Sequence, residues 1–137
     1  VIHDNLAQNV WPFWDAHPEI RGYLVLPPFS MYLNSRLLTM GEDQWQSYLD
    51  FRTSLAEGVS QRPQLRLYDF QTITEITTDW RNYRDQAHFH PRIHQRILED
   101  ISADRHRLTA DQVAAANALL DTQLRQWLAS RGPGESR

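Results

Sequence analysis

The chain of 137 residues contains no cysteine. That absence excludes a disulfide framework, a thiolate zinc site and a cysteine nucleophile. No apolar run approaches the roughly 20 residues that a membrane-spanning helix needs, and no signal peptide is visible in the sequence. The first residue is Val1 where a natural chain normally starts with Met, which indicates that a longer precursor has been trimmed or only partly included.

A surplus of positive charge is also missing. All 14 basic residues are arginines scattered along the chain, and with 17 acidic residues they give a net charge of −3. Proteins that bind nucleic acid normally carry a basic face, so we expect no nucleic-acid partner. The length suits one domain with one hydrophobic core. We expect that domain to cover residues 1–131, with a flexible tail over 132–137.

Hydrophobic periodicity predicts alternating helices and strands. We expect helices over residues 4–17, 31–38, 43–59, 91–102 and 109–130, and strands over 21–26 and 65–70. Residues 71–82 are expected to hold a turn and a short helix. Pro12 should kink or end the first helix, and residues 109–112 resemble a capping box. In the helix over 91–102 we expect the apolar side chains to face inward, namely Ile93, Ile97, Leu98 and Ile101.

This order of elements predicts an α/β fold with parallel strands and helical crossovers. The strand over 21–26 is apolar throughout, as in a sheet that is covered on both faces. Two strands are too few for such a sheet. We therefore expect the second half of a larger α/β domain, or a chain that completes its sheet with a partner. A homodimer through the exposed sheet edge is one such arrangement.

The most informative stretch carries Asp85 and His88, an Asp-x-x-His pair between the second strand and a helix that Pro91 opens. A histidine that acts as a general base needs a neighbouring acceptor to fix its tautomer and raise its basicity. Asp85 is placed to be that acceptor, although the residues offer no convincing nucleophile. The structural alternative is that Asp85 caps the following helix and that His88 packs beneath it.

Three further residues are candidates for contact with a substrate. Ser30 offers a hydroxyl at the end of a strand, although a helix N-cap is the commoner use of serine there. Asn82 is suited either to a substrate hydrogen bond or to stabilising its loop. Trp80 lies close to the Asp-x-x-His pair and is the aromatic residue to test for ligand contact, whereas Trp45 and Trp127 lie on helical stripes typical of core packing.

The histidines of the same region allow a second interpretation. His88, His90 and His94 have a spacing that could hold a metal ion, and imidazole suits zinc. We favour a solvated helix start over a metal site, because no carboxylate has obvious ligand spacing, and we expect no cofactor.

Asp69 ends a strand, where a capping or turn role is commoner than chemistry.

Three blocks of sequence carry a resemblance to a known family. They are Asn5-Leu6 with Asn9-Val10 and Pro12; Leu26-Pro27-Pro28-Phe29-Ser30; and Leu67-Tyr68-Asp69-Phe70 with the stretch from Asn82 to Pro91. Together they resemble the C-terminal half of SGNH-type (GDSL-like) hydrolase relatives from bacterial cell-envelope and polysaccharide gene clusters. The resemblance extends from about residue 5 to about residue 117.

The resemblance implies a three-layer α/β/α, flavodoxin-like sheet and a Ser-His-Asp arrangement in which Asp85 and His88 match the family's acid and base. The family's nucleophilic serine and its oxyanion-hole Gly and Asn lie in an N-terminal half that this sequence lacks. The implied function is an esterase or acyltransferase that acts on acyl groups, typically acetyl, of envelope polysaccharide.

The resemblance also implies a periplasmic or other extracytoplasmic location, with any membrane anchor in a segment outside this chain. The main alternative is a relative that keeps the fold as a non-catalytic binding or interaction module. A small domain that binds metal through its histidines is a weaker alternative.

Overall fold

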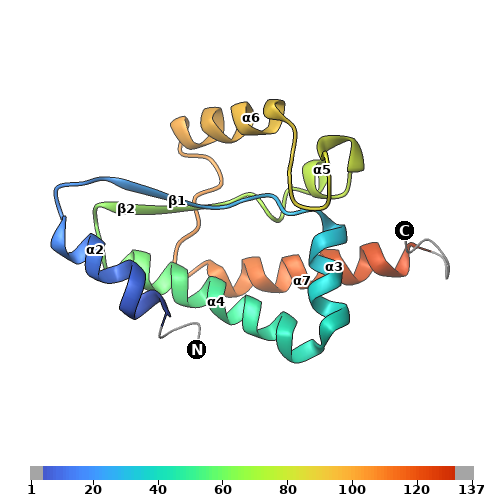
Figure 1. Cartoon of the computed structure of the whole chain (residues 1–137), viewed down its shortest axis with the longest axis horizontal. Coiled ribbons are helices and arrows are strands. Elements are labelled where there is room, and N and C mark those ends of the chain that lie inside the picture. The colour runs from blue at the N-terminus through green and yellow to red at the C-terminus, as the bar shows by residue number, and fades with distance from the viewer. Residues whose placement is uncertain (1–4, 132–137) are drawn as a thin grey trace.

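The computed structural model describes residues 5–131, and Figure 1 shows how its elements are arranged. The chain forms a π-helix η1 (Leu6–Val10), α2 (Trp11–Ala16), β1 (Gly22–Leu26), α3 (Met31–Met40), α4 (Glu42–Ser60), β2 (Leu65–Asp69), α5 (Thr74–Thr77), a 3-10 helix η2 (Trp80–Asn82), α6 (Pro91–Ser102) and α7 (Val113–Ala129). The two strands, the turn with a short helix after β2, and the helix over 91–102 are therefore confirmed.

The strands form a parallel pair whose register runs from Gly22 opposite Leu65 to Leu26 opposite Asp69. Figure 1 shows α6 over one face of this pair and α2, α4 and α7 over the other. The α/β class is thus confirmed, with helices on both faces as a parallel sheet requires. Within residues 5–131 the sheet has two strands.

Each face of the sheet packs into its own apolar cluster, because successive side chains of a strand point to opposite faces. Leu65 and Leu67 pack with Leu55 of α4 and Val113 of α7. On the other face Tyr68 and Phe70, at the end of β2, pack with residues of α6 such as Ile93. A third cluster joins α3, α4 and α7; its buried members are Met31, Trp45, Leu49, Leu120 and Leu124.

The two edges of the sheet differ. The edge of β2 that faces away from β1 is occupied by the segment before α7, where the amide of Leu108 donates to the carbonyl of Leu67 at 2.8 Å. On β1, Gly22 donates to the carbonyl of Gln64 at 3.0 Å and Leu26 accepts from Phe70 at 3.0 Å. Alternation in a parallel ladder then directs the peptide groups of Tyr23 and Val25 to the outer edge. Within residues 5–131 no strand pairs with that edge.

A buried polar network ties the end of β2 to two helices. Arg52 of α4 is fully buried, and its guanidinium donates to Asp69 Oδ2 at 2.7 Å and to Asn117 Oδ1 of α7 at 2.7 Å. It also donates to the side-chain oxygen of Gln71. Asp69 Oδ1 accepts the amide of Gln71 at 2.9 Å, so the expected turn role of Asp69 is confirmed alongside its ion pair.

The expected kink or end of the first helix at Pro12 is confirmed: η1 ends at Val10, and Pro12 stands in the first turn of a separate helix, where its missing N–H costs nothing. Two other local expectations are wrong. The capping box is absent, since α7 begins at Val113 and Gln112 makes no side-chain cap bond. Leu98 is 65 % exposed, because α6 turns Ile93 and Ile97 inward and leaves Leu98 on the opposite side. Asp4, the expected cap of the first helix, and the expected tail over 132–137 lie outside the described residues.

We expect Arg52→Leu to lower the free energy of unfolding by about 3–5 kcal/mol, because the buried carboxylate of Asp69 loses its charged partner. Arg66→Ala is the control: Arg66 lies 3.4 Å from Asp104 in a pair that is almost half exposed. Its loss should cost at most about 1 kcal/mol. Urea unfolding of both variants measures the difference, and equal losses would show that the Arg52 network does not stabilise the fold.

Candidate functional site

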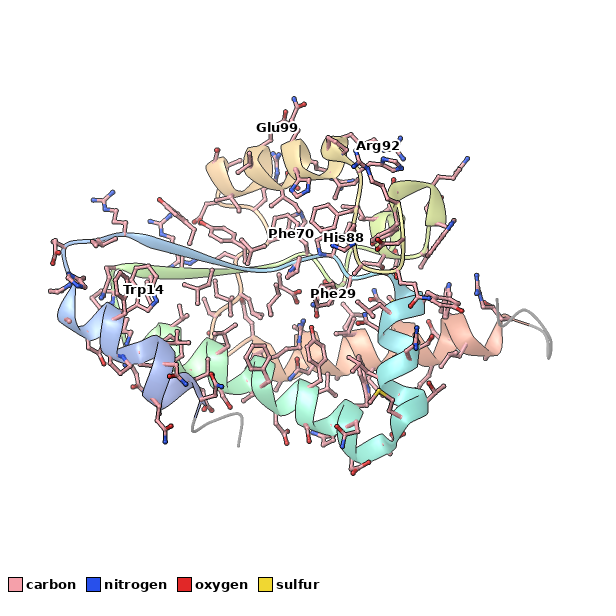
Figure 2. All side chains as sticks on the ribbon, viewed as in Figure 1. Trp14, Phe29, Phe70, His88, Arg92 and Glu99 are labelled. Carbon is pink, nitrogen blue, oxygen red and sulfur yellow. The ribbon has the colours of Figure 1, made fainter. Side chains whose placement is uncertain are left out.

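The Asp-x-x-His pair lies in a loop that closes on itself. The amide of Arg84 donates to the carbonyl of His88 at 2.7 Å, and the amide of His90 donates to the carbonyl of Asn82 at 2.8 Å. An isolated antiparallel bridge joins Tyr83 to Phe89 around the same loop. In Figure 2, His88 lies on this loop, toward the side of the molecule on which β1 leads into α3. In open α/β sheets this carboxyl end of the strands is where ligands bind.

Three hydrogen bonds hold the carboxylate of Asp85. Oδ1 accepts the amides of Ala87 at 2.9 Å and of His88 at 2.8 Å, while Oδ2 lies 2.7 Å from Nδ1 of the His88 ring. The backbone amide of Ala87 first, then that of His88 and the imidazole, lower the pKa of Asp85 to about 2. The carboxylate is therefore ionised at neutral pH and only accepts hydrogen bonds.

This geometry fixes the tautomer of His88. Because Asp85 only accepts, the proton of the neutral ring is on Nδ1 and the lone pair is on Nε2. The side chain of His88 is 78 % exposed, and within residues 5–131 its Nε2 has no hydrogen-bond partner. A base that is oriented through one nitrogen and open at the other is what general-base chemistry requires.

The alternative that Asp85 caps α6 and that His88 packs beneath this helix does not hold. The N-cap residue of α6 is His90, which makes no side-chain cap bond, and Asp85 satisfies amides of its own loop instead. His88 is exposed and is not packed beneath a helix.

Ser30 is the N-cap of α3, as expected from its position. Its hydroxyl accepts the amide of Leu33 at 3.1 Å and donates to the carbonyl of Gln86 at 2.6 Å. Ser30 is 2 % exposed, and both hydrogen bonds of its hydroxyl are made inside the fold. Ser30 is therefore not placed to contact a substrate. Gln86 stands between Asp85 and His88, and Ser30 therefore anchors the loop of the pair to α3.

Asn82 also serves the loop and not a ligand. Its Nδ2 donates to the carbonyls of Glu75 and Ile76, both at 3.1 Å, and its Oδ1 accepts from Arg92 at 3.0 Å. The residue is buried. These bonds use both N–H donors of the amide and one acceptor position of Oδ1, so of its two expected roles Asn82 shows the one that stabilises its loop.

Trp80 is the expected substrate-contact residue that stays available. Its side chain is 52 % exposed. The ring centroid lies 6.1 Å from that of Tyr32 on α3 and 6.4 Å from that of Tyr83 in the loop.

The serines of residues 5–131 do not supply a nucleophile to His88. Each of the seven donates its hydroxyl to a backbone carbonyl; they are Ser30, Ser35, Ser47, Ser54, Ser60, Ser102 and Ser130. Six of these acceptors lie three or four residues earlier in the same helix. The nucleophile that the Asp-His pair needs is thus not found in the described part of the chain.

The histidines that follow the pair have other surroundings. His90 begins α6, and the ring of His94 lies 4.4 Å from that of Phe89. Across residues 5–131 no three side chains of the His, Asp and Glu types are grouped so that they could hold a metal ion. The reading of His88, His90 and His94 as a zinc site therefore has no geometric support.

One polar contact of the site gave no signal in the sequence. Arg36 of α3 donates from Nη1 to Oε1 of Gln86 at 3.0 Å, across 50 positions of the chain. An exposed arginine on a short helix has no distinctive spacing, so only the folded chain shows that it borders the loop.

Comparison of the chain with models of known protein families, with curated proteins and with solved structures finds no match. None of the helices within residues 5–131 has the length and apolar character needed to cross a membrane.

We expect neutral His88 to be the Nδ1–H tautomer, and Asp85→Ala to abolish that preference because the acceptor at Nδ1 is lost. Long-range ¹H–¹⁵N correlation spectra report the tautomer directly, with His94 as the internal control. An unchanged tautomer of His88 in the variant would show that Asp85 does not orient the ring.

The carboxyl of Asp85 should titrate with a pKa of about 2, below its ordinary value of 3.8. Because this pKa is lowered in the fold, its hydrogen bonds stabilise the loop above the ordinary pKa and are lost as the pH falls through about 2. Carboxyl ¹³C shifts measure the titration. In His88→Ala the pKa should stay below 3.8, since the amide of Ala87 is the largest cause; a return to 3.8 would contradict this assignment.

We expect Ser30→Ala to cost about 1–2 kcal/mol, because α3 loses its cap and the loop loses its anchor at Gln86. Hydrogen exchange at the amides of Ala87 and His88 should become faster in this variant. Ser35→Ala is the matched control, because Ser35 donates only to the carbonyl of Tyr32 in its own helix. Faster exchange in both variants, or in neither, would exclude an anchoring role for Ser30.

Proposed function

We propose that this chain supplies the Asp-His half of a Ser-His-Asp site that hydrolyses or transfers an acyl ester, typically acetyl, on cell-envelope polysaccharide. The observation that carries the proposal is the 2.7 Å contact between Asp85 Oδ2 and His88 Nδ1, in a loop that leaves Nε2 unpaired within residues 5–131. The resemblance of the Asp-x-x-His stretch and of the Pro-Pro-Phe-Ser block to SGNH-type proteins supports the choice of reaction and substrate.

The chemistry follows from the two nitrogens of His88. Nε2 removes the proton of a serine hydroxyl while the oxygen attacks the ester carbonyl, and Asp85 stabilises the imidazolium that forms. The imidazolium then gives its proton to the departing sugar oxygen, which leaves an acyl-serine. Water or the hydroxyl of a second sugar attacks this intermediate, with Nε2 again taking the proton, so hydrolysis and transfer differ only in the acceptor.

The nucleophile has to come from outside residues 5–131, either from a further part of the same protein or from a partner chain. The open edge of β1 is suited to receive it. A parallel strand paired with Tyr23 and Val25 would end at the same edge of the sheet as Leu26 and Asp69. A turn that follows such a strand would lie at the carboxyl ends of the strands, where ligands bind in this class of fold.

An apolar hollow lies between η1, α3 and α4. It has a volume of about 440 Å³, and its lining includes Leu6, Leu37, Tyr48 and Phe51. Leu6 and Phe51 also belong to the cluster against which Leu24 of β1 packs. An apolar side chain supplied from outside residues 5–131 fits this hollow. An extracytoplasmic location is part of the proposal, since its substrate is in the cell envelope.

A serine-reactive fluorophosphonate tests the proposal on the longest natural polypeptide that contains these residues. We expect one adduct by intact mass, formed at least about 10³-fold more slowly in His88→Ala because the base activates the serine. His94→Ala, which changes a neighbouring exposed histidine, should label at the normal rate. The chain of 137 residues alone should form no adduct, because its described serines bond to backbone carbonyls.

Two outcomes would count against the proposal. No adduct on the long polypeptide would favour a non-catalytic module that binds or interacts through the same fold. An adduct that forms equally fast in His88→Ala would place a reactive serine elsewhere and remove the pair from the reaction.

A further inference from the structure

Trp80 differs from the other four tryptophans in how its ring is used. Trp45 is buried and donates its indole N–H to Asp121 at 2.8 Å. The rings of Trp11 and Trp127 lie under the guanidinium groups of Arg62 and Arg131, and Trp14 packs against the cluster that contains Leu65 and Leu67. Among the five tryptophans only Trp80 has an exposed side chain, and within residues 5–131 its N–H has no acceptor.

The exposed ring of Trp80 is held in place from several sides. The ring of Tyr83 stacks with it at 29° between planes, and Tyr83 is itself fixed by its hydroxyl, which donates to the carbonyl of Pro28 at 2.7 Å. Tyr32 of α3 meets it edge-on. Asp79 caps the short helix that begins at Trp80 by accepting the amide of Arg81 at 3.0 Å. A ring that is already ordered loses little conformational entropy when a ligand binds.

Helix α3 links the Trp80 ring to the loop of the Asp-His pair. Tyr32 and Arg36 lie one turn apart on α3, and Arg36 donates to Gln86, the residue that follows Asp85. Ser30, at the start of the same helix, holds the carbonyl of Gln86. The first turns of α3 thus contact both the Trp80 ring and the loop of the Asp-His pair.

A single exposed ring with hydrogen-bond donors beside it suits one sugar better than a protein surface. The C–H face of a pyranose packs on the electron-rich face of an indole, and its hydroxyls bond to guanidinium and amide groups at the rim. A stable protein interface buries about 800 Å² on each partner and centres on an apolar core. The residues next to Trp80 in the chain are instead charged, since Asp79 and Arg81 form an ion pair at 2.9 Å.

We infer that Trp80, with Arg36 and Gln86, forms a subsite for one pyranose ring of a glycan, placed so that an ester on that sugar or its neighbour reaches His88. The inference rests on the proposed function, whose substrate it defines as a chain of pyranose sugars. Trp80 and Arg36 are binding residues in this account and take no part in proton transfer.

Binding of oligosaccharides tests the subsite without any catalysis. We would titrate the protein with β-1,4-linked hexasaccharides of glucose, mannose, xylose, N-acetylglucosamine and mannuronic acid, and follow the backbone amide shifts of residues 80–88. At least one should bind with a millimolar Kd, and Trp80→Ala should weaken it about tenfold through loss of one stacking contact. Phe13→Ala is the matched control, because Phe13 is 51 % exposed on α2 at the other end of the sheet.

The outcomes separate this inference from the proposed function. His88→Ala should bind the sugar as tightly as the original protein while it loses fluorophosphonate labelling. Failure of all five sugars to bind, or equal binding by Trp80→Ala and Phe13→Ala, would overturn the subsite even in a protein that labels normally. Tight sugar binding in a protein that does not label would support the subsite and contradict the catalytic proposal.

Discussion

The ion pair between Arg52 and Asp69 is the interaction on which the position of the candidate site depends most. Both side chains are buried, and a charge in such a place is tolerated only with a partner and with its remaining hydrogen bonds satisfied. Arg52 meets this condition by joining the end of β2 to Asn117 of α7. The same network holds the side chain of Gln71, which lies just beyond the end of β2. The chain therefore leaves the sheet in a fixed direction.

From that point the loop of the Asp-His pair is defined by backbone hydrogen bonds more than by packing. Asn82 closes one end of the loop through the carbonyls of α5, and Ser30 holds its centre against α3. Inside it, two amides and one imidazole orient the carboxylate of Asp85. Tyr83 and Phe89 also pack this loop against the cluster beneath α6. An oriented and exposed imidazole is thus held on a loop that a rigid scaffold supports.

Local sequence signals predicted the parts of the fold that local physics controls. The strands follow from apolar runs, and α6 follows from a proline at its first helical position. The Asp-x-x-His spacing predicted the contact between Asp85 and His88. Each of these signals depends on neighbouring residues. The contact of Ser30 with Gln86 spans 56 positions, and that of Arg52 with Asn117 spans 65. Such pairs have no periodicity, so the sequence offered the helix cap of Ser30 but not its second partner.

The same limit explains why Asn82 was open to two readings and why Leu98 was misplaced. The amide of Asn82 finds its partners only after α5 has folded back over the loop. In α6 the buried stripe passes through Ile93, Ile97 and the paired Asp100, so one apolar residue remains outside it. The α/β class and the contact between Asp85 and His88 were therefore accessible from sequence, while the residues that support the pair were not.

The most direct test of the account is a crystal structure of the longest natural polypeptide that contains these residues. We predict a parallel strand hydrogen-bonded to Tyr23 and Val25 of β1, followed by a serine whose hydroxyl lies about 2.6–3.2 Å from Nε2 of His88. The account would be contradicted if β1 remained an open edge and Nε2 faced solvent or a non-nucleophilic side chain.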